Sequence, residues 1–216
     1  MALGFSAQSS GSNGDILPII KWDTKAGDMI RQDRRQESDG VWVKDEAEIE
    51  FPVQFIMDME NIEIGYLSFA SGAPDFRVAK IGAARPECPP DLGPDGKPAF
   101  KDCFRVRLYN KDFGLREFSH TAKTVMRPMD VLHDQYESEK ANNPNKVPVV
   151  EVSGSEVVKI ATPQGELRFK PPVMRITQWV DRPAAMDGNQ TPSVPDAGNE
   201  RTTQAPPPVT SGADLF

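Results

Sequence analysis

The strongest constraint on the fold of this chain is a run of nine residues in which apolar and polar side chains alternate. In residues 102–110, Phe104, Val106 and Leu108 alternate with Cys103, Arg105, Arg107 and Tyr109. A period of two places the two sets on opposite faces of a β-strand. We therefore expect a half-buried strand with one apolar face and one face that is rich in basic and aromatic residues.

Similar short strands are expected over much of the chain. They cover residues 16–22, 41–44, 48–58, 63–70, 76–81, 113–120, 147–152, 156–162, 166–170 and 173–180. The segments 48–58 and 63–70 are expected to form a hairpin. One helix is predicted over residues 129–141, with Pro128 preset for its first turn. Residues 84–98 contain five prolines, which predicts a long irregular loop.

Many short strands and a single helix in the second half predict a mainly β protein. A small OB-like β-barrel fits this order of elements, and a sandwich or a jelly roll fits the number of strands nearly as well. The expected domain covers residues 15–183. Residues 1–14 are expected to be a flexible N-terminal arm, and residues 184–216, which are rich in proline and polar side chains, a disordered tail.

The tail ends in an acidic residue followed by two hydrophobic ones, Asp214, Leu215 and Phe216. Leu and Phe gain nothing in a solvated tether, so we interpret this tip as a bait for a pocket on another protein. Acidic tails that are rich in proline and glycine and end in Phe occur in single-stranded-DNA-binding proteins of bacteria and phages. The chain resembles the phage and prophage members of that family. The resemblance implies an OB-type fold, sequence-independent coating of single strands in DNA replication and recombination, and recruitment of partner proteins through the tip.

The net charge of −7 at first argues against a nucleic-acid partner. The tail holds four acids and one base, which leaves 28 acids against 24 bases, a net of −4, in residues 15–183. Phosphate binding depends on how cations are arranged locally, so a nearly balanced domain can still carry a basic groove.

Proteins that bind single strands need cations that follow the phosphates and rings on which bases stack. Three clusters interleave the two types and are the expected DNA-binding residues. The first is Arg105, Arg107, Tyr109, Lys111, Phe113, Arg116 and Phe118; the second is Lys21 and Trp22 with Lys25, Arg31, Arg34 and Arg35; the third is Arg168, Phe169, Lys170 and Arg175, followed by Trp179 and Arg182. The arginines of the second cluster are expected on a loop. Trp22 is a better stacking candidate than Trp42 or Trp179, and solvated faces with core aromatics are the competing interpretation of each cluster.

Motifs of catalysis are missing from the sequence, which has no phosphate-binding glycine loop, nucleophile elbow or zinc-protease helix. Cys88, Cys103, His120 and His133 are spaced too widely for a typical zinc site, and we expect no metal or other cofactor. The protein is not expected to be an enzyme. A virion or tail assembly role, or an enzyme site built from scattered residues, remains as an alternative.

The sequence also bears on where the protein acts. It lacks a signal peptide and an apolar run long enough to span a bilayer, so the expected location is the cytoplasm of a bacterial host cell. Self-association into a homo-oligomer is left open.

Overall fold

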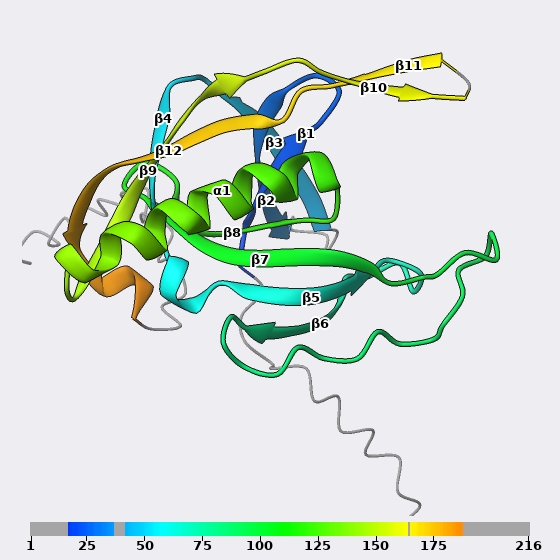
Figure 1. Ribbon diagram of the computed structural model, residues 1–216, viewed down its shortest axis with the longest axis horizontal. Helices are drawn as coiled ribbons and strands as arrows, with labels where there is room; N and C mark the ends of the chain where they lie inside the picture. Colours follow the sequence, from blue (N-terminus) through cyan, green and yellow to red (C-terminus); the bar gives the residue numbers. More distant parts are fainter. Residues whose placement is uncertain (1–16, 37–41, 164, 188–216) are drawn as a thin grey trace, which may run out of the picture.

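The protein is mainly β, with one α-helix, as predicted (Figure 1). The computed structural model describes residues 17–36, 42–163 and 165–187, without the side chains of residues 34–36 and 42. The predicted N-terminal arm and the tip residues Asp214, Leu215 and Phe216 lie outside the described residues.

One large sheet contains ten of the described strands. Eight of them follow one another in the order β12 (Pro172–Asp181), β9 (Lys146–Ser155), β4 (Val53–Met57), β7 (Lys101–Asn110), β8 (Gly114–His120), β1 (Ile19–Asp23), β2 (Asp28–Gln36) and β3 (Trp42–Ile49). The other two are β5 (Glu63–Ser68), which pairs with β7, and β6 (Asp75–Lys80), which pairs with β5. A separate two-stranded sheet consists of β10 (Val158–Thr162) and β11 (Gly165–Phe169). The helical elements are η1 (Met59–Asn61), α1 (Lys123–Glu139), η2 (Lys140–Asn142) and η3 (Ala184–Met186).

The core lies between the large sheet and α1, which crosses it (Figure 1). The alternation in β7 has the predicted effect, because Phe104, Val106 and Leu108 are all buried. The ring of Phe104 packs edge-on against Phe118 of β8, with centroids 5.2 Å apart. The hydrophobic effect on this face therefore fixes which side of β7 is left to solvent.

The helix begins at Lys123, six residues before its predicted start, and ends at Glu139. Pro128 consequently lies inside the helix and not in its first turn. The extra residues bring Val125 onto the buried face that also carries Leu132. Burial of this longer face offsets the backbone hydrogen bond that proline cannot donate.

The predicted hairpin between residues 48–58 and 63–70 is wrong. β4 and β5 do not pair with each other, and both run antiparallel to β7 along the same edge. η1 lies between them, and its buried Met59 anchors the chain to the core. β4 and β5 thus follow each other along the same edge of β7. The chain does not turn back on itself between them, because buried Met59 holds η1 against the core.

The segment after β1 is also a strand, contrary to the expected loop. β2 pairs with β1 on one side and with β3 on the other. It therefore places the backbone of Arg31, Arg34 and Arg35 in a ribbon. Its charged residues hide the apolar alternation, and the strand is established by cross-strand pairing, for example of buried Met29 with Trp22 and Ile49.

The described strands do not close into a barrel, because the sheet ends at β12 and at β3. Hydrogen bonds nevertheless join the β1–β2 turn to the segment before β12. The backbone N of Lys170 donates to the Thr24 carbonyl (2.7 Å), and Trp22 Nε1 donates to the Lys170 carbonyl (2.8 Å). These contacts close one side of the core without a strand ladder.

Candidate nucleic-acid interface

The solvent-facing side of β7 carries three residues of the first predicted cluster. Arg105, Arg107 and Tyr109 alternate with the buried apolar residues and keep partial or full exposure. The same side continues over β5 and β6, because Glu63 lies opposite both Arg105 and Lys80 in the strand register. Three neighbouring strands therefore share one face, which is open to solvent around Arg107 and covered at Cys103 and Leu67, both buried.

Arg105 combines a cation with an aromatic ring on this surface. Its guanidinium lies 4.8 Å from the centroid of Phe76 on β6. Its Nε donates to Glu117 Oε2 at 2.7 Å, and Glu63 lies 3.7 Å from its Nη1. Arg105 is thus held in place beside Phe76 by the ring and two carboxylates.

A hollow of about 380 Å³ adjoins Arg105 at the place where β4 ends and β5 begins. We call it the Arg107 hollow. It is lined by Asp58, Asn61, Glu63, Lys80, Arg105, Val106, Arg107, Arg182, Met186 and Asp187. Four cations thus face three carboxylates in one concave site.

Most of the cations in the hollow are already paired. Arg182 donates to both oxygens of buried Asp58, at 2.9 and 2.6 Å, and also to Asp187. The ammonium of Lys80 donates to the Asn61 side-chain oxygen at 2.7 Å. Arg107 is exposed and makes no ion pair with a carboxylate of the described residues. It is therefore the cation of the hollow that is best placed to take an anion from solvent.

Asp58 keeps its negative charge despite its position. Burial alone raises the pKa of Asp58, but hydrogen bonds from Arg182 and Asn61 and the charges of Arg182 and Arg107 outweigh it. The resulting pKa lies below the ordinary value of an aspartate. The hollow therefore retains a fixed carboxylate at its base, and Arg182 neutralises it.

Three predicted DNA-binding residues are buried, which corrects their assignment. Trp22 and Phe118 are only 4% and 1% exposed and belong to the core, so neither ring offers a face to a base. Arg116 is also buried and donates to the Phe113 carbonyl and to Asp33 Oδ1. Asp33 neutralises the charge of Arg116 inside the protein, because a buried guanidinium requires a partner.

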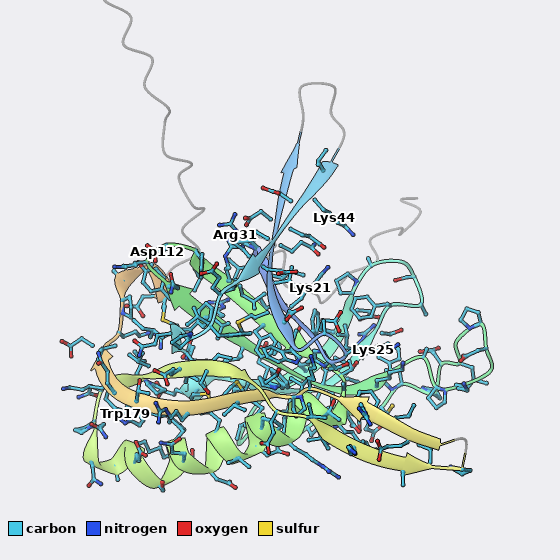
Figure 2. The ribbon with its side chains drawn as sticks, turned by 90° about the horizontal axis from the view of Figure 1, so that it is seen from above. Lys21, Lys25, Arg31, Lys44, Asp112 and Trp179 are labelled. Atoms are coloured by element: carbon cyan, nitrogen blue, oxygen red, sulfur yellow. The ribbon has the colours of Figure 1, made fainter. Side chains whose placement is uncertain are left out.

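Lys21 and Arg31, two cations of the second cluster whose side chains are described, lie apart on the ribbon of β1 and β2 (Figure 2). Lys21 pairs with Glu46 at 2.8 Å, and Arg31 Nε lies 3.1 Å from Asp33 Oδ2. Arg34 and Arg35 share β2, and their side chains are not among those described. Acids on the same ribbon thus neutralise Lys21 and Arg31.

Arg168 and Lys170 of the third cluster lie away from the Arg107 hollow. Arg168 pairs with Glu166 on the β10–β11 sheet, and Lys170 Nζ donates to the Ala26 carbonyl at 2.9 Å. Both views show this sheet at the opposite end of the molecule from η3, whose Met186 lines the hollow (Figures 1 and 2). The three predicted clusters therefore do not converge on one groove.

The remaining members of the first cluster lie at the β7–β8 turn. Lys111 is exposed in the turn itself, and half-buried Phe113 packs near Phe55 at 6.1 Å between ring centroids. Trp179 is likewise half-buried, and its ring stacks on Tyr136 of α1, 5.6 Å away. Figure 2 shows it across the molecule from the labelled lysines.

Sequence reasoning missed three residues of the β5–β6 surface. Phe69, in the turn after β5, is 62% exposed, Phe76 lies beneath Arg105, and Lys80 lines the hollow. The alternation of Phe76, Val78 and Lys80 in the sequence was the available signal. This alternation predicts which residues share a face of β6. Only the pairing of β6 with β5, and of β5 with β7, shows that this face continues the surface of Arg105.

The cysteines and histidines do not form a metal site. Within the described ranges, no three His, Cys, Asp or Glu side chains are grouped so that they could hold a metal ion. Burial raises the pKa of the Cys103 thiol to about 12 and lowers that of His120, whose Nδ1 accepts from the Ala122 amide. No helix in the described part of the chain has the length and apolar character needed to cross a membrane.

Comparison with known proteins adds no family or relative to this description. No family model, no curated protein and no solved structure matches the chain.

Proposed function

We propose that the protein binds single-stranded DNA without sequence preference, through the solvent face of β6, β5 and β7 and the adjoining Arg107 hollow. The observation that carries the proposal is that a free arginine, Arg107, lies near a second arginine, Arg105, which contacts an aromatic ring. Arg107 is exposed and unpaired with any carboxylate of the described chain, and the guanidinium of Arg105 lies 4.8 Å from the ring centroid of Phe76. A phosphate binds at the first, and a base stacks on the second.

Ion pairs on this face do not exclude DNA. Arg105 and Glu63 are each about one-third exposed, and exposed ion pairs contribute only about 0–1 kcal/mol. A phosphate can therefore replace Glu63 at little cost, while buried Glu117 keeps its hydrogen bond from Arg105. Phe69 supplies a second ring, at the far end of the same hairpin, on which a base can stack.

We also propose that the sheet is an open relative of the OB-type barrel. Two features support this: α1 lies between β8 and β9, and Lys170 bridges the β1–β2 turn to the segment before β12. The open OB-type sheet and the basic and aromatic surface of β6, β5 and β7 together favour the role of a phage-type single-strand-binding protein. Such a protein acts in replication or recombination, in the cytoplasm of a bacterial host cell. In that role Asp214, Leu215 and Phe216 recruit a partner protein.

The test is a titration of labelled poly-dT oligonucleotides at several salt concentrations. We expect binding that is tighter than to duplex and that weakens steeply with salt. Arg107→Gln should reduce the slope of log affinity against log salt by about one unit, because one phosphate contact is lost. Phe69→Ala should weaken binding by about 1–3 kcal/mol without changing that slope.

Arg77→Gln is the matched control for Arg107→Gln. Arg77 is exposed on β6, pairs with Asp75 and alternates with Phe76, so the variant removes the same charge from the opposite face of that strand. It should leave the salt slope unchanged. Equal effects of the two arginine variants, or equal affinity of the protein for duplex and single strands, would contradict the proposed site.

An assembly component is the second candidate. The exposed apolar side chains on β10 and β11 favour it, because such residues commonly contact other proteins. Salt dependence separates the two functions, since a protein that only contacts other proteins shows no affinity for poly-dT that falls with salt.

A further inference from the structure

A second hollow adjoins the Arg107 hollow at the C-terminal end of α1. It has a volume of about 390 Å³, and Arg182 lines both hollows. Glu60 of η1, Tyr136 in the last turn of α1 and Lys146 at the start of β9 also line it. Figure 1 shows η1, the end of α1 and the start of β9 side by side. We call this site the Lys146 hollow.

Two opposite charges in the Lys146 hollow are available to a ligand. Lys146 and Glu60 are both exposed, and neither forms an ion pair with another described residue. The other two cations already have partners, because Lys140 Nζ lies 2.7 Å from Glu137 Oε2 and Arg182 holds the buried carboxylate beside it. A ligand that fits this hollow therefore brings an anionic group for Lys146 and a hydrogen-bond donor for Glu60.

Tyr136 contributes a hydroxyl group and little ring surface. Its side chain is only 8% exposed, and Trp179 stacks on its ring with centroids 5.6 Å apart. Burial and, to a smaller extent, the charge of Glu60 raise the pKa of Tyr136, so the hydroxyl keeps its proton. The hollow therefore recognises its ligand through hydrogen bonds and not through stacking.

A nucleotide carries both of the groups that this hollow requires. Lysine binds phosphate, and side chains such as those of Asn143, Asn145 and Tyr136 commonly donate to phosphate oxygens. A glutamate accepts from the exocyclic amino group of cytosine. Thymine has no amino group, and the two carbonyl groups beside its single N–H repel a carboxylate. Glu60 is therefore suited to cytosine and not to thymine.

We propose that the Lys146 hollow binds one nucleotide of the strand that crosses the Arg107 hollow, with its phosphate on Lys146 and the amino group of its base on Glu60. This inference rests on the proposed function, and Arg182, which lines both hollows, marks where the strand passes from one to the other. The preference concerns one nucleotide per copy, so the other contacts of the strand remain independent of sequence. The same chemistry suits a free nucleotide, and the experiment separates the two sources.

The base contact is tested by comparing oligo-dC with oligo-dT at pH 7.5. The wild type should bind oligo-dC about five- to tenfold more tightly, the value of one added base contact. Glu60→Gln should bind both alike, because an amide both donates and accepts and so suits either base. Glu156→Gln is the matched control, because Glu156 is exposed just before β10. It should keep the preference for oligo-dC.

The phosphate contact is tested by titrations at several salt concentrations. Lys146→Gln should reduce the slope of log affinity against log salt by about one unit for both oligonucleotides. Lys123→Gln removes the same charge at the opposite end of α1 and should leave the slope unchanged.

The outcomes separate this inference from the proposed function. Equal wild-type affinity for oligo-dC and oligo-dT, a preference that survives in Glu60→Gln, or equal slopes for the two lysine variants would overturn the nucleotide site and leave the proposed function intact. A wild type that binds neither oligonucleotide would overturn both. Binding of free dCMP by such a protein would assign the hollow to a free nucleotide, against the proposal.

Discussion

The ion pair between Arg182 and Asp58 is the clearest single-residue feature of this protein. The side chain of Asp58 is 3% exposed, and both of its oxygens accept hydrogen bonds from the Arg182 guanidinium. The pair ties the end of β12 to the start of η1 and borders the Arg107 hollow. Met186, packed beside it, is 1% exposed, so the ordered domain extends past residue 183, where the sequence predicted its end.

Removal of Arg182 should therefore destabilise the protein strongly. Arg182→Gln leaves the Asp58 carboxylate buried without its counter-charge, and we expect a loss of about 3 kcal/mol in the free energy of unfolding. Denaturation by urea measures this loss. Arg175→Gln, which breaks the exposed pair with Glu151, should have little effect on unfolding. Similar losses in both variants would show that the buried pair has no special role.

His120 makes stability depend on pH near neutrality. Burial lowers the pKa of His120, so the unfolded chain takes up the proton before the folded protein does. Stability should then fall as the pH drops through about 6.5, the ordinary value for histidine, and continue to fall until the folded pKa is reached. Urea denaturation at pH 7.5 and below pH 6 measures the change.

The depressed pKa of Asp58 acts at lower pH. Its contribution to stability is present above the ordinary aspartate value and is lost as the pH falls through the lower folded pKa.

Two histidine variants are the controls for the effect near neutrality. His120→Gln should flatten only the dependence of stability on pH near neutrality, and His133→Gln should retain that dependence, because His120 is untouched. If His133→Gln alone flattens the curve, the assignment to His120 is incorrect.

At the scale of elements, α1 is held by one buried face. Leu132 is 1% exposed, whereas its neighbour Val131 is 68% exposed. Leu132→Ala should reduce the free energy of unfolding by about 2–5 kcal/mol, since it leaves a cavity. Val131→Ala should change it by less than about 0.5 kcal/mol. Thermal or urea denaturation of this adjacent pair tests the orientation of the helix, and comparable losses would contradict it.

At the scale of the molecule, the β1–β2 turn packs tightly against β9 and the segment before β12 at Gly27. This residue has a φ of +81° in the β1–β2 turn, and a Cβ there would lie 2.5 Å from Ser155 Oγ and 2.7 Å from Lys170 Cδ. Gly72 has nearly the same φ, +82°, but open space around it. The two glycines therefore differ in packing and share the same backbone requirement.

Gly27→Ala should accordingly be more damaging than Gly72→Ala. Both variants strain a left-handed residue, at roughly 1–2 kcal/mol. Gly27→Ala adds a clash with the chain before β12, which should contribute roughly a further 1–3 kcal/mol. Urea denaturation of the two variants gives the difference directly. Equal losses would mean that the bridge through Lys170 does not constrain the fold.

The sequence alone determined the features that depend on neighbouring residues. The alternation of Phe104, Val106 and Leu108 predicted both the strand and its buried face, because side chains of a strand alternate whatever its partners are. The mainly β class, the two strands of the β10–β11 sheet and the single helix were likewise predicted from local sequence patterns.

Only the tertiary structure decided which strands are neighbours and which charges remain available. Asp33 neutralises the charge of Arg116, from which it is 83 residues away in the chain. The carbonyl of Lys170 accepts a hydrogen bond from buried Trp22, from which it is 148 residues away. A basic or aromatic residue has the same appearance in the sequence whether it meets solvent or such a distant partner. Burial and ion pairing depend on contacts between remote segments, so Arg107 could be distinguished from Arg116 only in the folded protein.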